Sequence, residues 1–360
     1  MRKYFLDNIR WISILLLFPY HTCMIYNNWG ENFYVKSSGV SILSAFIQGT
    51  SPWFMPLLFV IAGISSNYAL KKRTPKEFIN ERRAKLLNPL LYGILFLVPI
   101  QTFFAEKFHN GYTGNYFYQY ILFFTKSTDL SGYTGGFTPA HLWFIFYLFI
   151  ISLLAIPIVT KYDKNNIRLK IANLSVIRLI PLFIFPLFMS LLLDIGGKSL
   201  GEFLALFILG YIVLSEDIIQ EKLENNRFIL FISFIILTTI NLLIIYLWKV
   251  NIGIFHDILI RIIAWIGILG IIGMGKHYLN FSNNTTKYFS KASFPIYIFH
   301  QSYVILVGYF ALKLFTAIST QVIFIILGSF ILTMITYEVF RRVSLLRNMF
   351  GIKKVAAPLR

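Results

Sequence analysis

The chain has 360 residues, of which 57% are hydrophobic and only 13% are charged. This balance excludes a soluble globular fold, since soluble domains are closer to half apolar and a quarter charged. The formal net charge of +18 would suggest nucleic acid in a soluble protein, but in a membrane protein it reports orientation, so we expect no nucleic-acid partner. The single cysteine, Cys23, excludes an intrachain disulfide.

Ten segments are long and apolar enough to cross a bilayer, which takes about 20 residues each. In chain order they cover 10–28, 53–70, 86–104, 141–160, 178–194, 200–215, 228–248, 254–274, 292–312 and 319–340. The stretch 39–48 is too short to span, and we interpret it as a surface or re-entrant piece. The sequence therefore predicts an all-α, polytopic transmembrane helix bundle of about ten spans, forming one integral membrane domain over residues 1–360.

Lysines and arginines are unevenly distributed among the segments that connect these spans. With the N-terminus inside, 26 of the 33 fall on the inner side, including the loop 71–85 and the basic tail 341–360. This asymmetry follows the positive-inside rule. We therefore expect both termini in the cytoplasm and a multi-pass protein of the cell (plasma or inner) membrane, with the lipid bilayer as its surroundings.

The longest predicted outer loop covers about 105–140 and is rich in tyrosine and glycine. Loops without a function are usually shorter. Its aromatic side chains either rest on lipid headgroups as an aromatic belt, or form a platform that stacks on the sugar rings of an acceptor. The residues alone leave both alternatives open.

The first predicted span carries two ionisable side chains, Arg10 at its cytoplasmic end and His21 near mid-membrane. Eleven helical residues separate them by about 16 Å along the axis but only about 20° around it, so both project from one stripe. Pro19 removes a backbone donor just before the histidine. A polar group at that depth should face the bundle interior or a wet cavity, and the alternative is a histidine that hydrogen-bonds between helices as packing.

Two of the other histidines lie at informative places. His300 is about eight residues into the ninth span, at a depth close to that of His21, and His141 begins the fourth span from the outer side, whereas His109 is interpreted as incidental. A metal site of His21 and His300 lacks a carboxylate or thiolate partner at matching depth, so we predict no metal.

Two charged pairs are predicted from spacing alone. In the eighth span, Asp257 and Arg261 have the i, i+4 spacing of a structural ion pair, and Glu338 with Arg341 or Arg342 is interpreted in the same way.

Five motifs occur in order along the chain. They are Arg10 and His21 in an R-x10-H pattern, MPLLFVIAGISS (55–66), KEFINERRAKLLNP (76–89), HLWFIFYL (141–148) and FPIYIFHQ (294–301). Together they make the chain resemble the integral membrane acyltransferases of acyltransferase family 3, near the branch that includes glucan-modifying members. The resemblance covers essentially the whole chain.

The resemblance implies an O-acyltransferase that moves an acyl group, acetyl or succinyl, from cytoplasmic acyl-CoA to a hydroxyl of a glycan or other extracytoplasmic acceptor. It implies that His21 is the catalytic residue and that Arg10, Arg82 and Lys85 bind acyl-CoA. No cofactor is expected to be bound permanently, and acyl-CoA, with acetyl-CoA favoured, is a co-substrate.

Two positions depart from the family pattern. Lys85 stands where arginine is usual, which removes bidentate phosphate binding there, and Ala62 replaces the serine of the F-x-x-S-G motif while Gly63 is kept. As supporting or acceptor-side residues we place Gly63, His141, Trp143 and His300.

The chemistry remains open at the sequence level. His21 either takes the proton of the acceptor hydroxyl as general base or is itself acylated and passes the group on. The main rival function is a transporter or flippase of a glycan intermediate, although we find neither an inverted repeat nor paired broken helices, and a non-catalytic relative is the third alternative. The sequence does not determine the acceptor, the acyl group or the oligomeric state.

Overall fold

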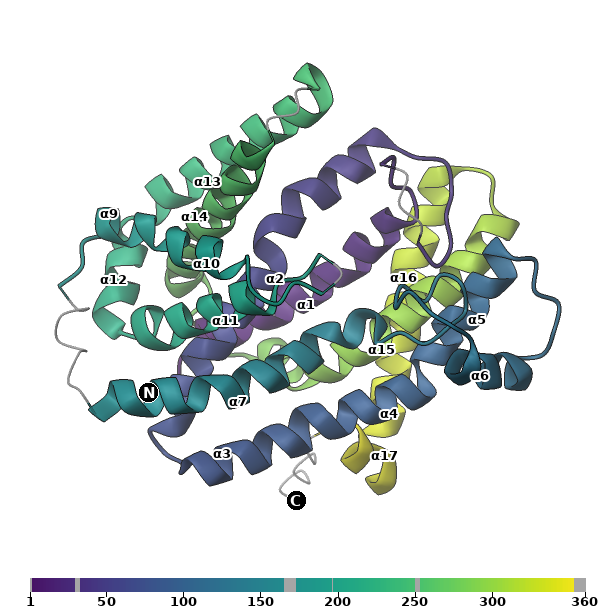
Figure 1. The fold of residues 1–360 in the computed structure, drawn as a ribbon, viewed down its shortest axis with the longest axis horizontal. Helices are drawn as coiled ribbons and strands as arrows, with labels where there is room; N and C mark the ends of the chain where they lie inside the picture. Colours follow the sequence, from purple (N-terminus) through teal and green to yellow (C-terminus); the bar gives the residue numbers. More distant parts are fainter. Residues whose placement is uncertain (1, 30–32, 165–172, 196, 250–252, 353–360) are drawn as a thin grey trace. The chain divides into compact units, whose positions relative to one another are not determined.

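The structure is a computed structural model that describes residues 2–29, 33–164, 173–195, 197–249 and 253–352 (Figure 1). Within these residues the chain is helical, with one isolated β-bridge between Asp194 and Ser199 and no strand. The prediction of an all-α protein is confirmed. The basic tail 341–360 lies in part outside the described residues.

Seven helical segments in the described part of the chain have the length and composition to cross a membrane. They are Ser41–Leu70, Pro75–His109, Ala140–Lys161, Arg227–Trp248, Ile254–Tyr278, Asn284–Leu314 and Ile318–Phe340. The first predicted span is also helical, as α1 (Tyr4–Met24), and two further predictions fall on the shorter apolar helices Val176–Met189 and Leu200–Leu214. Helices therefore occupy all ten predicted segments, and seven of them have both the length and the composition of a membrane span.

One prediction about the first connection is wrong. Helix α2 (Ser41–Leu70) is continuous over 30 residues and takes in most of the stretch 39–48, which is therefore not a separate surface or re-entrant piece. The prolines Pro52 and Pro56 lie inside this helix. Each proline removes one helical hydrogen bond, and helices of membrane proteins tolerate this loss where neighbouring groups compensate.

The helices form two compact units, each built from three separate stretches of chain. The first unit comprises Met1–Ser13, Gln48–Arg82 and Tyr147–Lys287, and the second comprises Ile14–Ile47, Arg83–Phe146 and Tyr288–Arg360. Helix α1 continues from the first unit into the second. The single domain expected over residues 1–360 stays a prediction.

The first unit combines the part of α2 from Gln48 onward with helices from the middle of the chain. These are α3 (Pro75–Arg82), the inner part of α7 (Trp143–Lys164), α9 (Val176–Leu179), η3 (Ile180–Phe183), α10 (Ile184–Met189), α11 (Leu200–Leu209), η4 (Gly210–Leu214), α12 (Asp217–Asn225), α13 (Arg227–Leu243), η5 (Ile244–Trp248) and α14 (Ile254–Tyr278). A buried apolar cluster of Phe234, Ile263 and Ile266 joins α13 to α14.

A charged pair in this unit differs from the prediction. Arg261 pairs with Glu202 of α11, with 3.0 Å between its Nη2 and the carboxylate Oε2. Its contact with Asp257 is instead a hydrogen bond to the backbone carbonyl, also at 3.0 Å. The predicted Asp257–Arg261 ion pair is therefore wrong, because a carboxylate from another helix takes the guanidinium.

Helix α2 packs directly on α11 and η4 through two glycines. A Cβ atom added at Gly63 would overlap the carbonyl oxygen of Phe207 and lie 2.9 Å from the backbone nitrogen of Tyr211. A Cβ added at Gly210 would overlap the backbone of Val60 in return. Small residues that let two helix backbones touch are typical of helix packing in membranes. Gly63 therefore serves this helix contact.

The second unit is arranged around α15 (Asn284–Leu314), the most buried of the seven long helices. Its other helices are the second part of α1, η1 (Arg83–Leu87), α4 (Asn88–Phe96), α5 (Val98–His109), α6 (Tyr116–Thr125), η2 (Ala140–Leu142), α16 (Ile318–Phe340) and α17 (Ser344–Met349).

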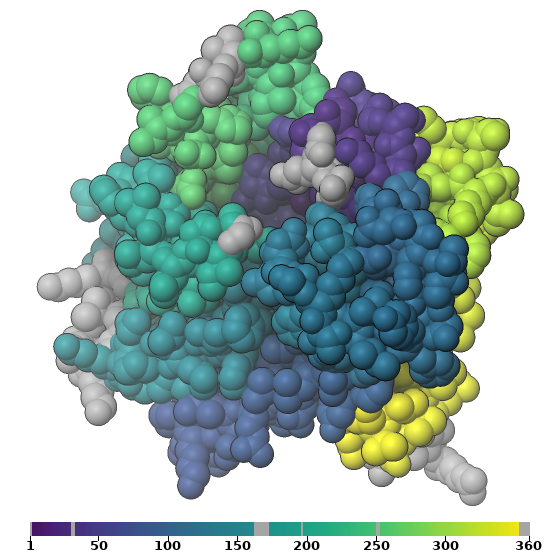
Figure 2. Space-filling model, turned by 45° about the vertical axis from the view of Figure 1, so that its right-hand side comes forward, coloured from purple at the N-terminus to yellow at the C-terminus, as the bar shows by residue number. Residues whose placement is uncertain are grey.

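The predicted outer loop 105–140 is folded. Its centre is α6, whose first turn is capped by Asn115, since the Asn115 side chain accepts the Tyr118 N–H at 2.9 Å. After the helix, Lys126 Nζ lies 2.6 Å from the carboxylate of Glu106. The segment forms a continuous surface, drawn in blue in Figure 2, on which Phe117 and Ile121 are exposed.

The glycine contact gives a direct test of the helix packing. Gly63→Ala should lower the free energy of unfolding by about 1–3 kcal/mol, because the new methyl group meets backbone that cannot rotate away. Gly49→Ala in the same helix is the matched control, since its Cβ would lie 3.6 Å from the Thr238 side chain, an ordinary contact. Thermal unfolding in detergent measures both, and equal melting temperatures for the two variants would contradict the packing.

Candidate functional site

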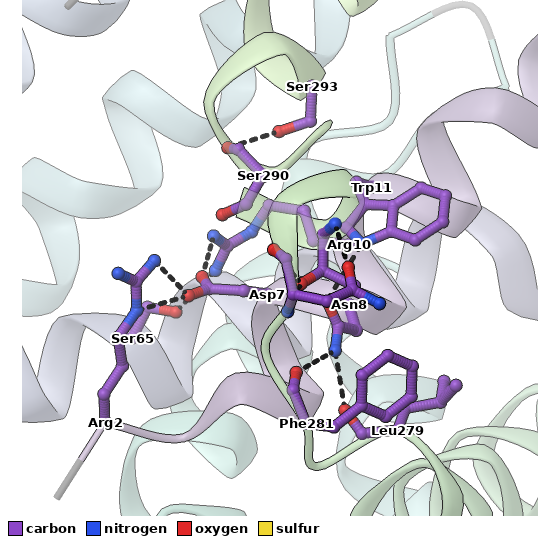
Figure 3. A network of polar contacts seen from close by, with 12 residues as sticks. Arg2, Asp7, Asn8, Arg10, Trp11, Ser65, Leu279, Phe281, Ser290 and Ser293 are labelled. Atoms are coloured by element: carbon purple, nitrogen blue, oxygen red, sulfur yellow. Dashed lines mark hydrogen bonds and ion pairs between the residues drawn. The ribbon is translucent and has the colours of Figure 1, made fainter. Parts of the chain in front are cut away.

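Arg10 belongs to a polar cluster near the start of α1, in the first unit (Figure 3). Its guanidinium lies 3.2 Å from Asp7 Oδ1 and donates to Ser65 Oγ at 2.8 Å. Asp7 also pairs with Arg2, at 2.7 Å. Two arginines, Arg2 and Arg10, thus share the Asp7 carboxylate, and the three side chains together carry a net positive charge. The Arg10 side chain is 34% exposed.

The start of α1 is held firmly in place. Asn8 Nδ2 donates to the carbonyl oxygens of Leu279 at 2.7 Å and of Phe281 at 2.9 Å (Figure 3). Both acceptors follow the end of α14. The bonds fix the rotation of α1 in the first unit and with it the direction in which Arg10 projects.

Arg82 reaches the same stretch of α2 from α3. It donates to Ser66 Oγ at 2.8 Å, and its guanidinium carbon lies 4.6 Å from the centre of the Phe78 ring. The successive serines Ser65 and Ser66 therefore each accept a hydrogen bond from an arginine of a different helix. Neither serine was singled out from the sequence, although both end the motif 55–66. Arginines of this kind suit a phosphate-bearing ligand.

Lys85 follows Arg82 by three residues. It lies in η1 and is partly buried, whereas Arg82 ends α3. The boundary between the two units falls between Arg82 and Arg83, so Lys85 belongs to the second unit.

Three histidines gather in the second unit. The ring centre of His300 lies 5.2 Å from that of His21 and 5.1 Å from that of His141. The rings come from α15, α1 and η2 in turn. His300 and His141 are buried, and His21 is partly exposed. Residues that are far apart in the sequence are therefore brought together around His300.

His141 has a hydrogen-bond partner at each ring nitrogen. Its Nε2 lies 2.9 Å from the Ile298 carbonyl oxygen, which can only accept, so Nε2 carries the proton. Its Nδ1 then accepts from Gln101 Nε2 at 3.3 Å. Gln101 also donates to Ser302 Oγ at 3.0 Å, and the backbone oxygen of His141 accepts from the Tyr297 hydroxyl. This network makes His141 a rigid, buried support.

His300 and His21 each have a nitrogen without such a partner. His300 Nδ1 lies 2.6 Å from the Tyr297 carbonyl oxygen, so Nδ1 carries the proton and Nε2 has a lone pair. Among the described residues, His300 Nε2 and His21 Nδ1 are buried without a hydrogen-bond partner. Buried polar atoms are usually paired, so an unpaired one calls for an explanation such as a bound water or a catalytic role.

The Phe33 ring packs against His21 and also contacts the segment 105–140. The Phe33 ring stacks on His21, with 6.1 Å between centres and 9° between planes, and contacts Tyr133 at 6.3 Å. The Phe33 carbonyl oxygen is 2.6 Å from Nε2 of His109. This contact ties the end of α5 to the segment that contains Phe33, and the interpretation of His109 as incidental to function stays a prediction.

Two remaining predictions concern a metal and Trp143. No group of three or more histidine, cysteine, aspartate or glutamate side chains in the described ranges is arranged to hold a metal ion. Trp143 begins α7, is partly exposed and contacts Phe144 edge to face at 6.4 Å.

The structure therefore contains an arginine cluster (Arg10 and Arg82), a histidine cluster (His21, His141 and His300) and several helices of membrane length. A family model described as an acyltransferase domain matches residues 3–338. The chain belongs to this family, the acyltransferase 3 family, and is a multi-pass membrane acyltransferase. The family assignment favours an enzyme over the transporter considered from the sequence.

Individual relatives are similar over their whole length. Proteins named glucans biosynthesis protein C from Salmonella paratyphi B, Salmonella dublin and Salmonella gallinarum are each 24% identical to this chain over 403 aligned positions. The alignments cover 98% of this chain and 95% of each relative. No solved structure matches the chain.

The support network around His141 can be tested by removing its central amide. Gln101→Leu should lower the free energy of unfolding by about 1–3 kcal/mol, because His141 Nδ1 loses its donor inside a buried environment. Thermal unfolding of the purified protein measures this effect. An unchanged melting temperature would show that the network does not hold His141 in place.

Proposed function

We propose that this acyltransferase moves an acyl group, acetyl or succinyl, from cytoplasmic acyl-CoA to a hydroxyl of a glycan on the outer side of the plasma or inner membrane. The observation that carries the proposal is α1 itself. One uninterrupted helix places Arg10 in a positive cluster and His21 in a histidine cluster. Along such a helix, eleven residues cover about 16 Å, which is about the reach of a pantetheine arm.

The donor end of the proposal is the arginine cluster. CoA carries several phosphate charges, and charge-assisted hydrogen bonds from guanidinium groups are strong. Arg10 and Arg82 both use neutral serine hydroxyls as partners. A phosphate oxygen is a better acceptor for these guanidinium groups than a hydroxyl. We assign Arg10 and Arg82 to the phosphates of acyl-CoA, with Lys85 as a further positive charge on the same face of the membrane.

His21 is the catalytic residue of the proposal. As general base it takes the proton of the acceptor hydroxyl while the oxygen attacks the thioester carbonyl; the carbon–sulfur bond breaks, and the CoA thiolate takes up a proton. As nucleophile it forms an acyl-imidazole, releases CoA, and then passes the acyl group to the hydroxyl. Both routes need a ring nitrogen with a lone pair that the substrates can reach, and the partial exposure of His21 supports this.

The acceptor class is supported by two observations. The relatives are named for glucans biosynthesis, which favours a glucan. The partly exposed ring of Tyr133 contacts Phe33, which stacks on His21, and an accessible aromatic face of this kind can stack on a sugar ring. We therefore favour a glycan acceptor that reaches His21 past these rings. His141 and His300 support His21 and do not contact the acceptor.

The first test removes the catalytic ring. His21→Ala should reduce transfer of label from radioactive acetyl-CoA to glucan oligosaccharides by about 10³-fold, within the range for general acid–base catalysis. The assay uses purified protein in lipid vesicles, with transferred label and released CoA as readouts. His277→Gln is the control, because that histidine is exposed and pairs with Glu224 outside the histidine cluster. Transfer that survives His21→Ala would overturn the assignment.

The second test addresses the donor site. Arg10→Ala should raise the KM for acetyl-CoA by about 10-fold or more, since a hydrogen bond to a charged group contributes about 1.5–3 kcal/mol. The kcat at saturating acetyl-CoA should change much less. Arg342→Ala is the matched control, because its side chain is 74% exposed and lies at the end of α16. A fall in kcat at unchanged KM would place Arg10 in the chemical step instead.

A further inference from the structure

We propose that His300 is a positioning residue for His21. In this proposal Nε2 of His300 accepts a hydrogen bond from the Nδ1–H of His21, directly or through one water. This bond holds the His21 ring with its own lone pair on Nε2 of His21. The inference rests on the proposed catalytic role of His21 and deepens it, because it names the group that sets the protonation of the reacting nitrogen.

The hydrogen-bonding capacities of the two rings are complementary. The Tyr297 carbonyl oxygen holds the proton of His300 on Nδ1, so that Nε2 is an acceptor. His21 Nδ1 can carry a proton and is then a donor. Both atoms are buried and lack any other partner among the described residues. One donor and one acceptor are thus left over on neighbouring rings.

The distance between the rings is suitable. Their centres are 5.2 Å apart and their planes are tilted by 36°. Ring nitrogens lie at the edge of the ring, so two nitrogens turned toward each other would lie closer than the centres. A rotation of His21 or a single water closes the gap, and hydrogen bonds at catalytic sites are often loose before substrates bind.

His300 is held too firmly to turn away from this contact. It has no exposed surface and sits on the most buried long helix. Edge-to-face contacts with Phe18 at 5.8 Å and with His141 at 5.1 Å pack its ring. Since His141 is itself fixed at both nitrogens, the acceptor of His300 has a defined direction.

The consequence for catalysis follows from proton positions. With Nδ1 of His21 protonated, its Nε2 has the lone pair that a base or a nucleophile requires. When Nε2 takes a proton or an acyl group, the ring becomes positive and its Nδ1–H bond to His300 strengthens. A third group that orients a catalytic histidine acts in this way in other acyl-transfer enzymes.

Two substitutions of similar volume separate this role from packing. His300→Leu fills the space without an acceptor, and His300→Gln keeps an oxygen that can accept from His21. We expect His300→Leu to lower the kcat of acetyl transfer by about 10²-fold with the KM for acetyl-CoA unchanged, and His300→Gln to recover at least tenfold of this loss. Equal losses in both variants, or a wild-type kcat in His300→Leu, would overturn the proposal.

A second measurement does not depend on turnover. In protein labelled with ¹⁵N-histidine, the His21 resonances, identified by their loss in His21→Gln, should report a proton on Nδ1 in the wild type. In His300→Leu the proton should redistribute toward Nε2. A wild-type ring with its proton on Nε2 would overturn the proposal even if the leucine variant does not fold.

The two proposals can fail separately. Absence of acetyl transfer by the wild-type protein, or transfer that persists in His21→Ala, defeats the proposed function. If His21→Ala loses activity as predicted but His300→Leu is fully active, only the role of His300 is defeated.

Discussion

Burying an imidazole in a membrane protein is unfavourable unless its nitrogens find partners, and this constraint organises the second unit. His141 satisfies both nitrogens through Ile298 and Gln101. His300 satisfies one, and its other nitrogen, like Nδ1 of the neighbouring His21, is buried without a partner among the described residues. Of these three histidines, His21 is the one that is partly exposed. That is the place where a substrate can complete the network.

Helix α1 connects this histidine cluster with the arginine cluster through its own backbone. Asn8 and Arg10 fix its first turns in the first unit, and Phe33 and His300 pack around its second half in the second. Residues of one α-helix keep a defined spacing along the helix axis. The proposed acyl-CoA donor, with its charged phosphates and a distant thioester, fits such a spacing.

Local and regular features could be predicted from the sequence, and contacts between distant segments could not. Hydropathy located helices at all ten predicted positions, because apolar runs determine them. The continuity of α2 was not predicted, because the apolar stretch 39–48 is too short to span by itself, whereas the helix runs on through Pro52 and Pro56. Arg261 was assigned to Asp257 four residues away, whereas Glu202 of another helix takes it. Likewise Ser65 and Ser66 carried no signal of their own, since only the arrival of Arg10 and Arg82 gives them a role.

The central claim is that one histidine joins a donor on the cytoplasmic side to an acceptor on the outer side. It is tested most directly with lipid vesicles that contain uniformly oriented protein, labelled acetyl-CoA on the side of the termini and glucan oligosaccharide on the opposite side. The account predicts labelled glucan on the side opposite to the donor, released CoA on the donor side, and neither product when His21 is alanine. Labelled glucan that forms only when both substrates share one side, or that forms without His21, would contradict it.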